Sequence, residues 1–288
     1  MGVVVNTNIS SITASRILSE NRADLEKAME RLASGKRINS AADDAAGMAV
    51  AAKMRADIGS LNQSVRNTND AISLVNTYDG AAAEIESILI RMRELAVQTR
   101  NGTYEEADRT NANFEYTALK NEITRIAGVS AFNRMTVGQG SSGAAGGTGV
   151  ADTTFTFYVG SDVAKTGNSI AFAAKALDLN LAVSSGTLNS VADTTNAASA
   201  IATLDDAITE LAANRAQAGA LINRLEHTVS NLMNVSQRLQ EAVSGIEDAD
   251  YAAESANLAR GMVLAQAGTA MLAQANQAPQ YILSLLRG

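Results

Sequence analysis

The feature that most constrains this chain is a run of apolar residues in its C-terminal half, spaced alternately by three and four positions. The run consists of Ile201, Leu204, Ile208, Leu211, Ala218, Ile222, Leu225, Val229, Leu232, Leu239, Val243 and Ile246. Only Arg215 and Ser236 interrupt it. A stripe this narrow and this long is typical of a coiled-coil seam, because a helix in a globular core presents a broader apolar face. The seam requires another long helix as its partner.

One other segment has the length to be that partner. Between Ile58 and Ala96 apolar residues again recur at intervals of three and four, which predicts a helix of about 40 to 50 residues. The helix should end near Asn101–Gly102, where the glycine would supply a left-handed cap. We therefore expect the N-terminal and C-terminal parts to pair antiparallel within one molecule. The predicted seam residues are Leu61, Val65, Ile72, Val75, Leu204, Ile208, Leu211, Ile222, Leu225, Leu232 and Leu239.

Between these helical parts the composition changes. A further helix is expected from about Glu105 to Ala127, ended by Gly128 and folded back on the long helix as a hairpin. Residues 138–149 are rich in glycine and read as a flexible loop. Residues 153–159 and 169–172 favour strands, with a turn at 160–162. The predicted fold class is mainly α, a long antiparallel coiled-coil bundle of discontinuous N- and C-terminal parts with a small β-hairpin subdomain, whose core would contain Phe155, Phe157, Tyr158 and Phe172.

The two termini carry too few apolar residues to fold alone. In residues 1–34 one helical face holds Leu18, Leu25, Met29 and Leu32, and residues 252–286 are rich in Ala, Gln and Asn with scattered Leu and Met. Ordering a residue costs about 1–2 kcal/mol of backbone entropy, which this sparse apolar area does not offset. We expect both termini to be poorly ordered in an isolated subunit and to fold when they meet other copies.

The composition excludes several classes of function. The chain has one histidine and no cysteine, so disulfides, cysteine nucleophiles and cysteine-based zinc sites are impossible. His227 has no second residue with which to build a catalytic or metal site, and Asp43–Asp44 are better explained as helix-capping residues than as an acid/base pair. We expect no enzyme activity and no cofactor. The net charge of −7 argues against nucleic-acid binding, and no stretch is apolar and long enough for membrane insertion.

Several stretches at both ends resemble one known family. They are Asn6–Thr7–Asn8, ERLASGKRINSAADDAAGMAVA at 30–51, RMRELAVQ at 91–98, NEITRIA and AFN within 121–133, IEDADYAAESANLAR at 246–260 and QAGTAMLAQANQAPQYILSLLR at 266–287. Through these motifs the chain resembles bacterial flagellin, in a short form that leaves no room for large outer domains. The resemblance implies an inner domain of terminal helices (1–43 plus 247–288), a helical domain (44–137 plus 191–246), and a glycine-rich loop and β-hairpin (138–190).

The resemblance also implies a function. Flagellins polymerise into the extracellular filament that drives swimming, and their terminal helices line a tube in which copies stack. The implied self-assembly residues are Leu18, Leu25, Met29, Leu32, Leu258, Met262, Met271, Leu272, Leu283 and Leu286. Besides other copies of itself, the implied partners are an export chaperone at the C-terminal tract and the filament cap and junction proteins. Export would proceed through a dedicated channel without a cleaved signal peptide, and the N-terminus shows none.

A second function is carried over residue by residue. In flagellins that activate the innate receptor Toll-like receptor 5, the recognised surface is the RELAVQ helix together with an acidic residue on the neighbouring helix. The matching positions here are Arg91, Leu95, Gln98 and Glu115. Ile90 departs from the polar residue expected beside them, which puts affinity in doubt. Because this face packs between subunits, the receptor would recognise monomers.

Two alternatives to a filament subunit remain at this point. A flagellar junction protein shares the terminal helices but joins or caps filaments. A flagellin-like surface protein that binds polysaccharide would need an exposed aromatic or charged groove.

Overall fold

The computed structural model describes residues 7–138, 153–160, 167–177 and 191–285, with the backbone alone for 278–285. The chain divides into two compact units, one formed by residues 1–58 with 237–288 and the other by residues 59–236. These divisions, at 58/59 and 236/237, differ from the domain boundaries implied by the resemblance, at 43/44 and 246/247. The implied boundaries lie close to the start of one helix and the end of another, and they stay a prediction. Each unit is described by itself.

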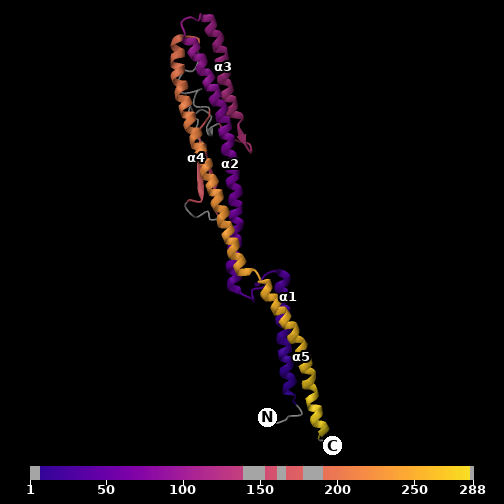
Figure 1. Ribbon diagram of the computed structural model, residues 1–288. Helices are drawn as coiled ribbons and strands as arrows, with labels where there is room; N and C mark the ends of the chain where they lie inside the picture. The colour runs from indigo at the N-terminus through magenta and orange to yellow at the C-terminus, as the bar shows by residue number, and fades with distance from the viewer. Residues whose placement is uncertain (1–6, 139–152, 161–166, 178–190, 286–288) are drawn as a thin grey trace. The chain divides into compact units, whose positions relative to one another are not determined.

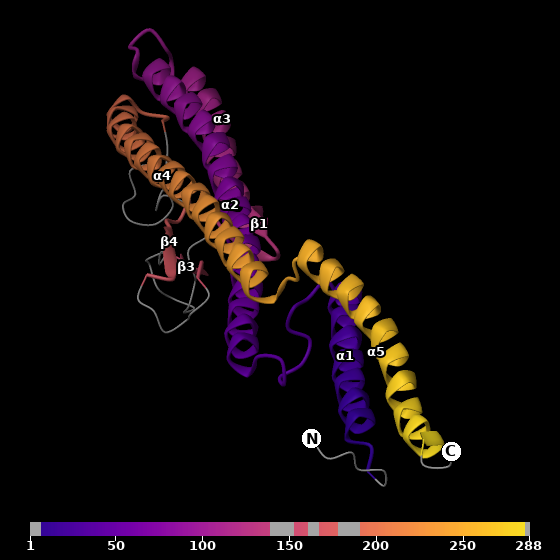
Figure 2. The same cartoon turned by 60° about the horizontal axis from the view of Figure 1, so that its bottom comes forward.

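The unit 59–236 is built on two long helices. They belong to α2 (Ala45–Arg100) and α4 (Thr194–Glu247), which lie side by side in both ribbon views (Figures 1 and 2). Polar contacts between them fix the direction of pairing: Ser236 Oγ lies 3.2 Å from Asn62 Oδ1, and Arg93 Nε lies 2.5 Å from Asp205 Oδ1. Higher numbers on α2 therefore meet lower numbers on α4. The predicted antiparallel pairing of the two parts of the chain is confirmed.

The buried seam runs in a different phase from the predicted one at several positions. On α2 one line of buried residues has spacings of three and four, and Leu74 and Leu95 beside it are buried as well. The line consists of Leu61, Ser64, Thr68, Ala71, Val75, Tyr78, Ala82, Ile85, Leu89, Met92, Ala96 and Thr99. On α4 the corresponding line consists of Ala200, Leu204, Ala207, Leu211, Asn214, Ala218, Leu221, Leu225, Leu232 and Ser236. Of the other predicted seam residues, Val65, Ile72, Ile208 and Ile222 lie beside this line and are only partly buried. Leu239 continues the α4 line three residues after Ser236 and is also only partly buried. Small residues such as Ser64, Ala71 and Ala218 share the seam with large ones such as Tyr78 and Leu204.

Helix α3 (Glu106–Val129) folds back beside α2, as predicted, and buries Tyr116, Ile123 and Ala127 (Figure 1). Two expectations about glycine were wrong. Gly102 has no positive φ, and α3 continues past Gly128 to Val129. The glycine that does cap a helix in the left-handed conformation is Gly35, with φ 70°, whose N–H donates to the carbonyl of Arg31 at 2.9 Å.

The unit also contains two antiparallel β-hairpins. Strands β1 (Ala131–Phe132) and β2 (Met135–Thr136) form a short hairpin that was not predicted from the sequence, with positive φ at its two turn residues Asn133 and Arg134. Strands β3 (Thr153–Tyr158) and β4 (Ser169–Ala174) form the predicted hairpin. The predicted turn at 160–162 and the glycine-rich loop lie largely outside the described residues.

The β3–β4 hairpin packs against α2 through one aromatic contact. The rings of Phe172 and Tyr78 meet edge to face with centroids 5.3 Å apart, and the Tyr78 hydroxyl donates to the carbonyl of Lys175 at 3.1 Å. Phe172 is buried, whereas Phe155 and Phe157 are only partly buried. Tyr158 is 53% exposed, so its assignment to the hairpin core was wrong.

In the other unit the terminal segments are helical. Helix α1 (Ile9–Ser34) begins after Asn8, whose Oδ1 accepts from the N–H of Ser11 at 3.1 Å, and α5 runs from Tyr251 to Leu285. The two helices lie side by side (Figure 2). Asp44 precedes α2 and its Oδ1 accepts from the N–H of Gly47 at 2.8 Å, which confirms the predicted capping role.

Candidate assembly and recognition surfaces

Helices α1 and α5 pair through a narrow line of residues with heptad-like spacing. On α1 these residues are Asn8, Ser11, Ala14, Leu18, Asn21, Leu25, Ala28 and Leu32, and on α5 they are Glu254, Leu258, Gly261, Ala265, Gly268, Leu272 and Ala275. A Cβ at Gly268 would lie 3.1 Å from Leu18 Cδ1, and one at Gly261 would lie 3.4 Å from the Cβ of Leu25. The helices therefore approach closely and bury little apolar area.

Polar contacts fix the ends of this antiparallel pair. At one end Asn8 Nδ2 donates to the carbonyl of Ala275 at 2.7 Å. At the other end Arg31 lies 2.9 Å from the Glu254 carboxylate, and the Tyr251 hydroxyl donates to the carbonyl of Leu32 at 3.2 Å. Ion pairs and hydrogen bonds specify a register but add modest net stability. The pair is thus well defined in geometry while weak in apolar packing.

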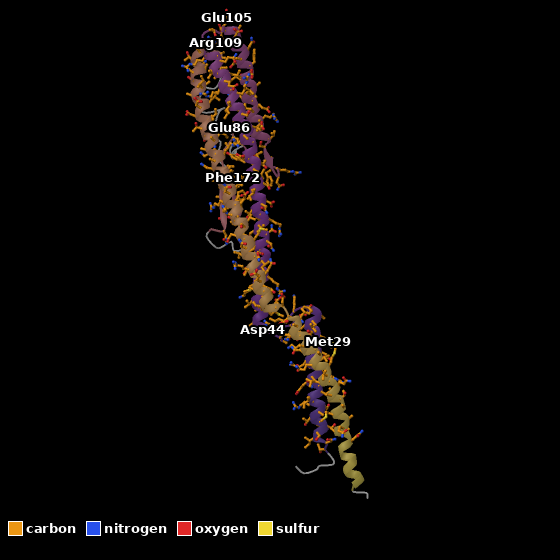
Figure 3. The ribbon with its side chains drawn as sticks, viewed as in Figure 1. Met29, Asp44, Glu86, Glu105, Arg109 and Phe172 are labelled. Atoms are coloured by element: carbon orange, nitrogen blue, oxygen red, sulfur yellow. The ribbon has the colours of Figure 1, made fainter. Side chains whose placement is uncertain are left out.

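Large apolar side chains remain exposed outside this line. We use the name outer face for these exposed residues, which lie on several sides of the two helices away from their mutual contact: Ile9, Ile12, Ile17, Met29, Met262, Val263, Leu264 and Met271. Met29 is labelled on α1 in Figure 3. Val263 and Met271 are 66% and 64% exposed, and four of these residues border a groove of about 490 Å³ between α1 and α5. A surface of this kind is typical of an interaction site.

The self-assembly residues implied by the resemblance divide between the two locations. Met29, Met262 and Met271 belong to the outer face. The leucines at 18, 25, 32, 258 and 272 lie instead in the contact between α1 and α5. The side chain of Leu283 and all of Leu286 lie outside the described residues. Five further exposed residues were not predicted from the sequence, although their positions off the heptad line could have indicated them: Ile9, Ile12, Ile17, Val263 and Leu264.

The segment between α1 and α2 is held by two carboxylates. Glu247 is buried and lies 2.5 Å from Arg55 and 3.9 Å from Lys36. Asp43 lies 2.8 Å from Lys27 Nζ and accepts from the backbone N–H of Ser40 at 3.0 Å. The hydrogen bond from Lys27, and after it the one from Ser40, hold the pKa of Asp43 well below its usual value.

The residues implied for receptor recognition lie at the α2–α3 contact. Arg91 pairs with Glu115 of α3 at 2.9 Å and with Glu94 of its own helix at 3.1 Å. The Glu115 carboxylate raises the pKa of the Arg91 guanidinium, with a smaller contribution from Glu94. The Arg91 and Glu115 side chains are 49% and 46% exposed.

The other two recognition residues differ in exposure. Gln98 is exposed, and its Nε2 donates to the Tyr104 hydroxyl at 3.1 Å. Leu95 is only 3% exposed and packs in the core, so any effect of Leu95 on recognition is exerted through the position of α2. Ile90 is exposed on the same helix. The structure thus presents Arg91, Gln98 and Glu115, and not Leu95, as groups that a partner could contact directly.

Comparisons with known proteins decide the family. The model of the bacterial flagellin N-terminal helical region matches residues 5–142, and the model of the C-terminal helical region matches residues 201–286. The chain belongs to the bacterial flagellin family. This flagellin is 42% identical over 287 residues to a flagellin of Halalkalibacterium halodurans, an alignment that covers 99% of this chain and 100% of the relative.

Other relatives give the same result. The flagellin is 38% identical over 286 residues to the flagellar filament 33 kDa core protein of Treponema phagedenis, covering 99% of this chain and 100% of the relative. A crystal structure of Bacillus cereus flagellin is 34% identical, covers 58% of this chain and 88% of that chain, and has a TM-score of 0.47. The two family models and the full-length relatives, rather than this crystal structure, identify the flagellin as a structural subunit of the flagellar filament, an extracellular component of the flagellum. None of the helices within the described residues is both long and apolar enough to span a membrane.

Proposed function

We propose that this flagellin polymerises for swimming motility through the outer face of α1 and α5, and that the folding of these helices is completed by assembly. The observation that carries the proposal is the exposure of eight large apolar side chains on two helices whose mutual contact is narrow. Complete burial of one such side chain is worth about 1.5–3 kcal/mol. A neighbouring copy that covers the outer face supplies the stabilisation that the α1–α5 contact lacks.

The proposal is tested by changing the outer face without touching the α1–α5 contact. The variant combines Met262→Gln with Met271→Gln, and its control combines Gln266→Ala with Gln274→Ala, two exposed polar positions of the same helix. We expect the methionine variant to raise the concentration needed for polymerisation by about a hundredfold, since two buried contacts are lost. The control should polymerise like the natural chain.

Sedimentation and electron microscopy give the result, and circular dichroism reports whether the monomers have the same helix content. Filaments of the methionine variant at the natural concentration, with matching circular dichroism, would contradict assembly through the outer face. In that outcome the chain still polymerises, but through a different surface. Failure of the natural chain itself to polymerise under seeding conditions would instead favour a flagellar junction protein or a polysaccharide-binding surface protein.

The same exposed residues support a partner before assembly. Inside the producing cell the exposed apolar residues of α5 would be shielded from solvent by an export chaperone that binds the C-terminal tract. Export would then proceed without a cleaved signal peptide. Titration of such a chaperone with the full chain and with the methionine variant tests this assignment. Equal affinities would show that the outer face is not the chaperone's binding surface. We also assign the outer face at the two ends of the filament to contacts with the filament cap and junction proteins.

A second function rests on a different observation. Arg91 and Glu115 join α2 to α3 at a half-exposed surface, and Gln98 lies about two helical turns further along α2. This arrangement supports recognition of the monomeric subunit by Toll-like receptor 5. The receptor would exchange the exposed Arg91–Glu115 ion pair for charged hydrogen bonds of its own, each worth about 1.5–3 kcal/mol.

A receptor-driven reporter assay with monomeric protein tests the second function. We expect Arg91→Ala to weaken activation by about tenfold or more. Arg125→Ala is the matched control, since Arg125 also forms an exposed ion pair, with Glu122 at 2.7 Å on α3. If both variants activate the receptor like the natural chain, Arg91 is not part of a recognised surface.

A further inference from the structure

Gly102, directly after α2, has no structural need to be glycine. It does not adopt positive φ, and a Cβ at this position would meet nothing within 4 Å. Gly102 and the preceding Asn101 are both exposed. The backbone and the packing at this turn would accept a side chain. The glycine therefore matters for the chemical reactivity of the Asn–Gly pair and not for the fold.

We propose that Asn101 is a site of spontaneous deamidation in the folded flagellin. The backbone nitrogen of Gly102 loses its proton and attacks Cγ of the Asn101 side-chain amide. A new N–Cγ bond forms, the bond from Cγ to the amide nitrogen breaks, and ammonia leaves with the proton it needs. Water then opens the resulting five-membered succinimide at either carbonyl, which gives isoaspartate or aspartate. One water is consumed, one ammonia is released, and nothing is oxidised or reduced.

The hydrogen bonds of the turn leave the attacking nitrogen uncovered. The N–H of Asn101 donates to the carbonyl of Gln98 at 3.1 Å, and the N–H of Tyr104 donates to the carbonyl of Asn101 at 3.4 Å. Among the backbone hydrogen bonds formed by the described residues, none uses the N–H of Gly102. No Cβ stands beside this nitrogen either, so the side-chain amide of Asn101 can approach it.

The carbonyl that shares its peptide group with this nitrogen is polarised. Besides the N–H of Tyr104, the guanidinium of Arg109 donates to the Asn101 carbonyl in a long contact of 3.5 Å. Electron density drawn toward this oxygen makes the N–H of Gly102 easier to deprotonate. Figure 3 labels Arg109 and Glu105 beside the turn at the first residues of α3. Because Arg109 contacts the backbone of Asn101, its positive charge would also favour the carboxylate that deamidation produces at this residue.

Other exposed asparagines lack this combination. Asn111 is also exposed, but it lies within α3 and is followed by Ala112. The N–H of a residue inside a helix is hydrogen-bonded to the preceding turn, and helical φ and ψ hold it away from the neighbouring side chain. Asn111 is therefore an internal reference in the same molecule for exposure without reactivity.

Incubation of the full chain at neutral and at mildly alkaline pH, followed by peptide mass mapping, tests the proposal. An isoaspartate-specific methyltransferase identifies the product. We expect the peptide containing Asn101 to gain the mass of deamidation, with isoaspartate present, and to do so faster at the higher pH. Gly102→Ala should slow the reaction by about tenfold, because the new Cβ shields the attacking nitrogen. Thermal unfolding followed by circular dichroism should show that this variant folds like the natural chain.

Three results would overturn the proposal. One is deamidation of Asn101 no faster than that of Asn111 in the folded chain. Another is an unchanged rate in the Gly102→Ala variant. The third is a product that contains aspartate alone, because direct hydrolysis of the side chain makes no isoaspartate. Incubation in denaturant adds a check of mechanism: the difference between Asn101 and Asn111 should narrow when α3 unfolds.

Discussion

Asp43 and Asp44 are neighbours in the sequence and hold different parts of the fold. Asp44 caps α2 through the N–H of Gly47, a role that the preceding Asn–Ser pair and the following helix made predictable. Asp43 instead binds the backbone N–H groups of Asn39 and Ser40 and the side chain of Lys27. The bond to Lys27 could not be predicted, because it depends on how the segment after Gly35 turns back toward α1.

The lowered pKa of Asp43 predicts a specific pH dependence. A carboxyl group whose pKa is lower in the folded than in the unfolded chain stabilises the fold above its unfolded pKa, near 3.8, and loses that contribution as the pH falls toward its folded value. Asp43→Asn should therefore lower stability at neutral pH, and its difference from the natural chain should shrink progressively below pH 3.8. Urea unfolding across the acid range measures this. A difference that stays constant would mean that the Asp43 charge is not what matters.

At the scale of the helices, the sequence predicted which helices pair and in which direction better than it predicted which residues are buried between them. The lengths, the antiparallel direction and the β3–β4 hairpin follow from apolar periodicity and strand-forming residues. The positions of the seam residues were predicted wrongly at Val65 and Ile72, because these large apolar side chains suggested a seam there. In the structure the buried seam positions are Ser64, Thr68 and Ala71. α2 contacts α3 and a hairpin as well as α4, so large apolar residues beside the seam also find cover. Hydrophobicity alone does not distinguish a small residue in the seam from a large one at its edge.

Asn214 is a polar residue in the seam that lowers stability and can specify the register of the helices. It is buried between Leu211 and Ala218 in the α4 line, and its Nδ2 finds no hydrogen-bond partner among the described residues. A buried amide without a partner costs about 1–3 kcal/mol, and polar seam residues are known to specify helix register. We expect Asn214→Leu to raise the free energy of unfolding by about 1–2 kcal/mol.

Chemical denaturation with far-UV circular dichroism measures the effect of Asn214→Leu. Ala216→Leu is the control, because Ala216 is exposed on the same helix and a surface change should stay within about 0.5 kcal/mol. A loss of stability in the Asn214 variant would indicate that the amide is satisfied in solution and holds the seam together.

At the scale of the whole chain, the discontinuous organisation was predictable from the sequence. Which terminal residues form the contact between α1 and α5, and which stay exposed, was not. The stripes at the two ends predicted partners that are distant in sequence, and the compact units confirm that each combines N-terminal with C-terminal residues. The leucines at 18, 25 and 32 are the most apolar residues of α1 and were expected to face other copies. In the structure all three lie in the contact with α5, where Gly261 lies against Leu25 and Gly268 against Leu18. In the assembly proposed above, residues such as Ile12 and Val263 would meet other copies.

The two units should consequently differ in local stability before assembly. The buried residues of α1 are Leu18 and Ala28 alone, whereas α2, α3 and α4 share a continuous core within residues 59–236. Segments with few buried apolar contacts open at much lower free energy than the core. In the monomer we expect backbone amides of α1 and α5 to exchange hydrogen at least tenfold faster than those of α2 around Leu89.

Assembly should remove that difference. Hydrogen exchange followed by mass spectrometry on filaments should show α1 and α5 protected to the level of the core, because a neighbouring copy buries the outer face and the free energy of association adds to that of folding. The Met262→Gln, Met271→Gln variant serves as the control and should keep fast exchange in both helices under polymerising conditions. If the termini of the monomer are already as protected as α2, their folding does not depend on assembly, and the outer face stabilises contacts between subunits without ordering the helices that carry it.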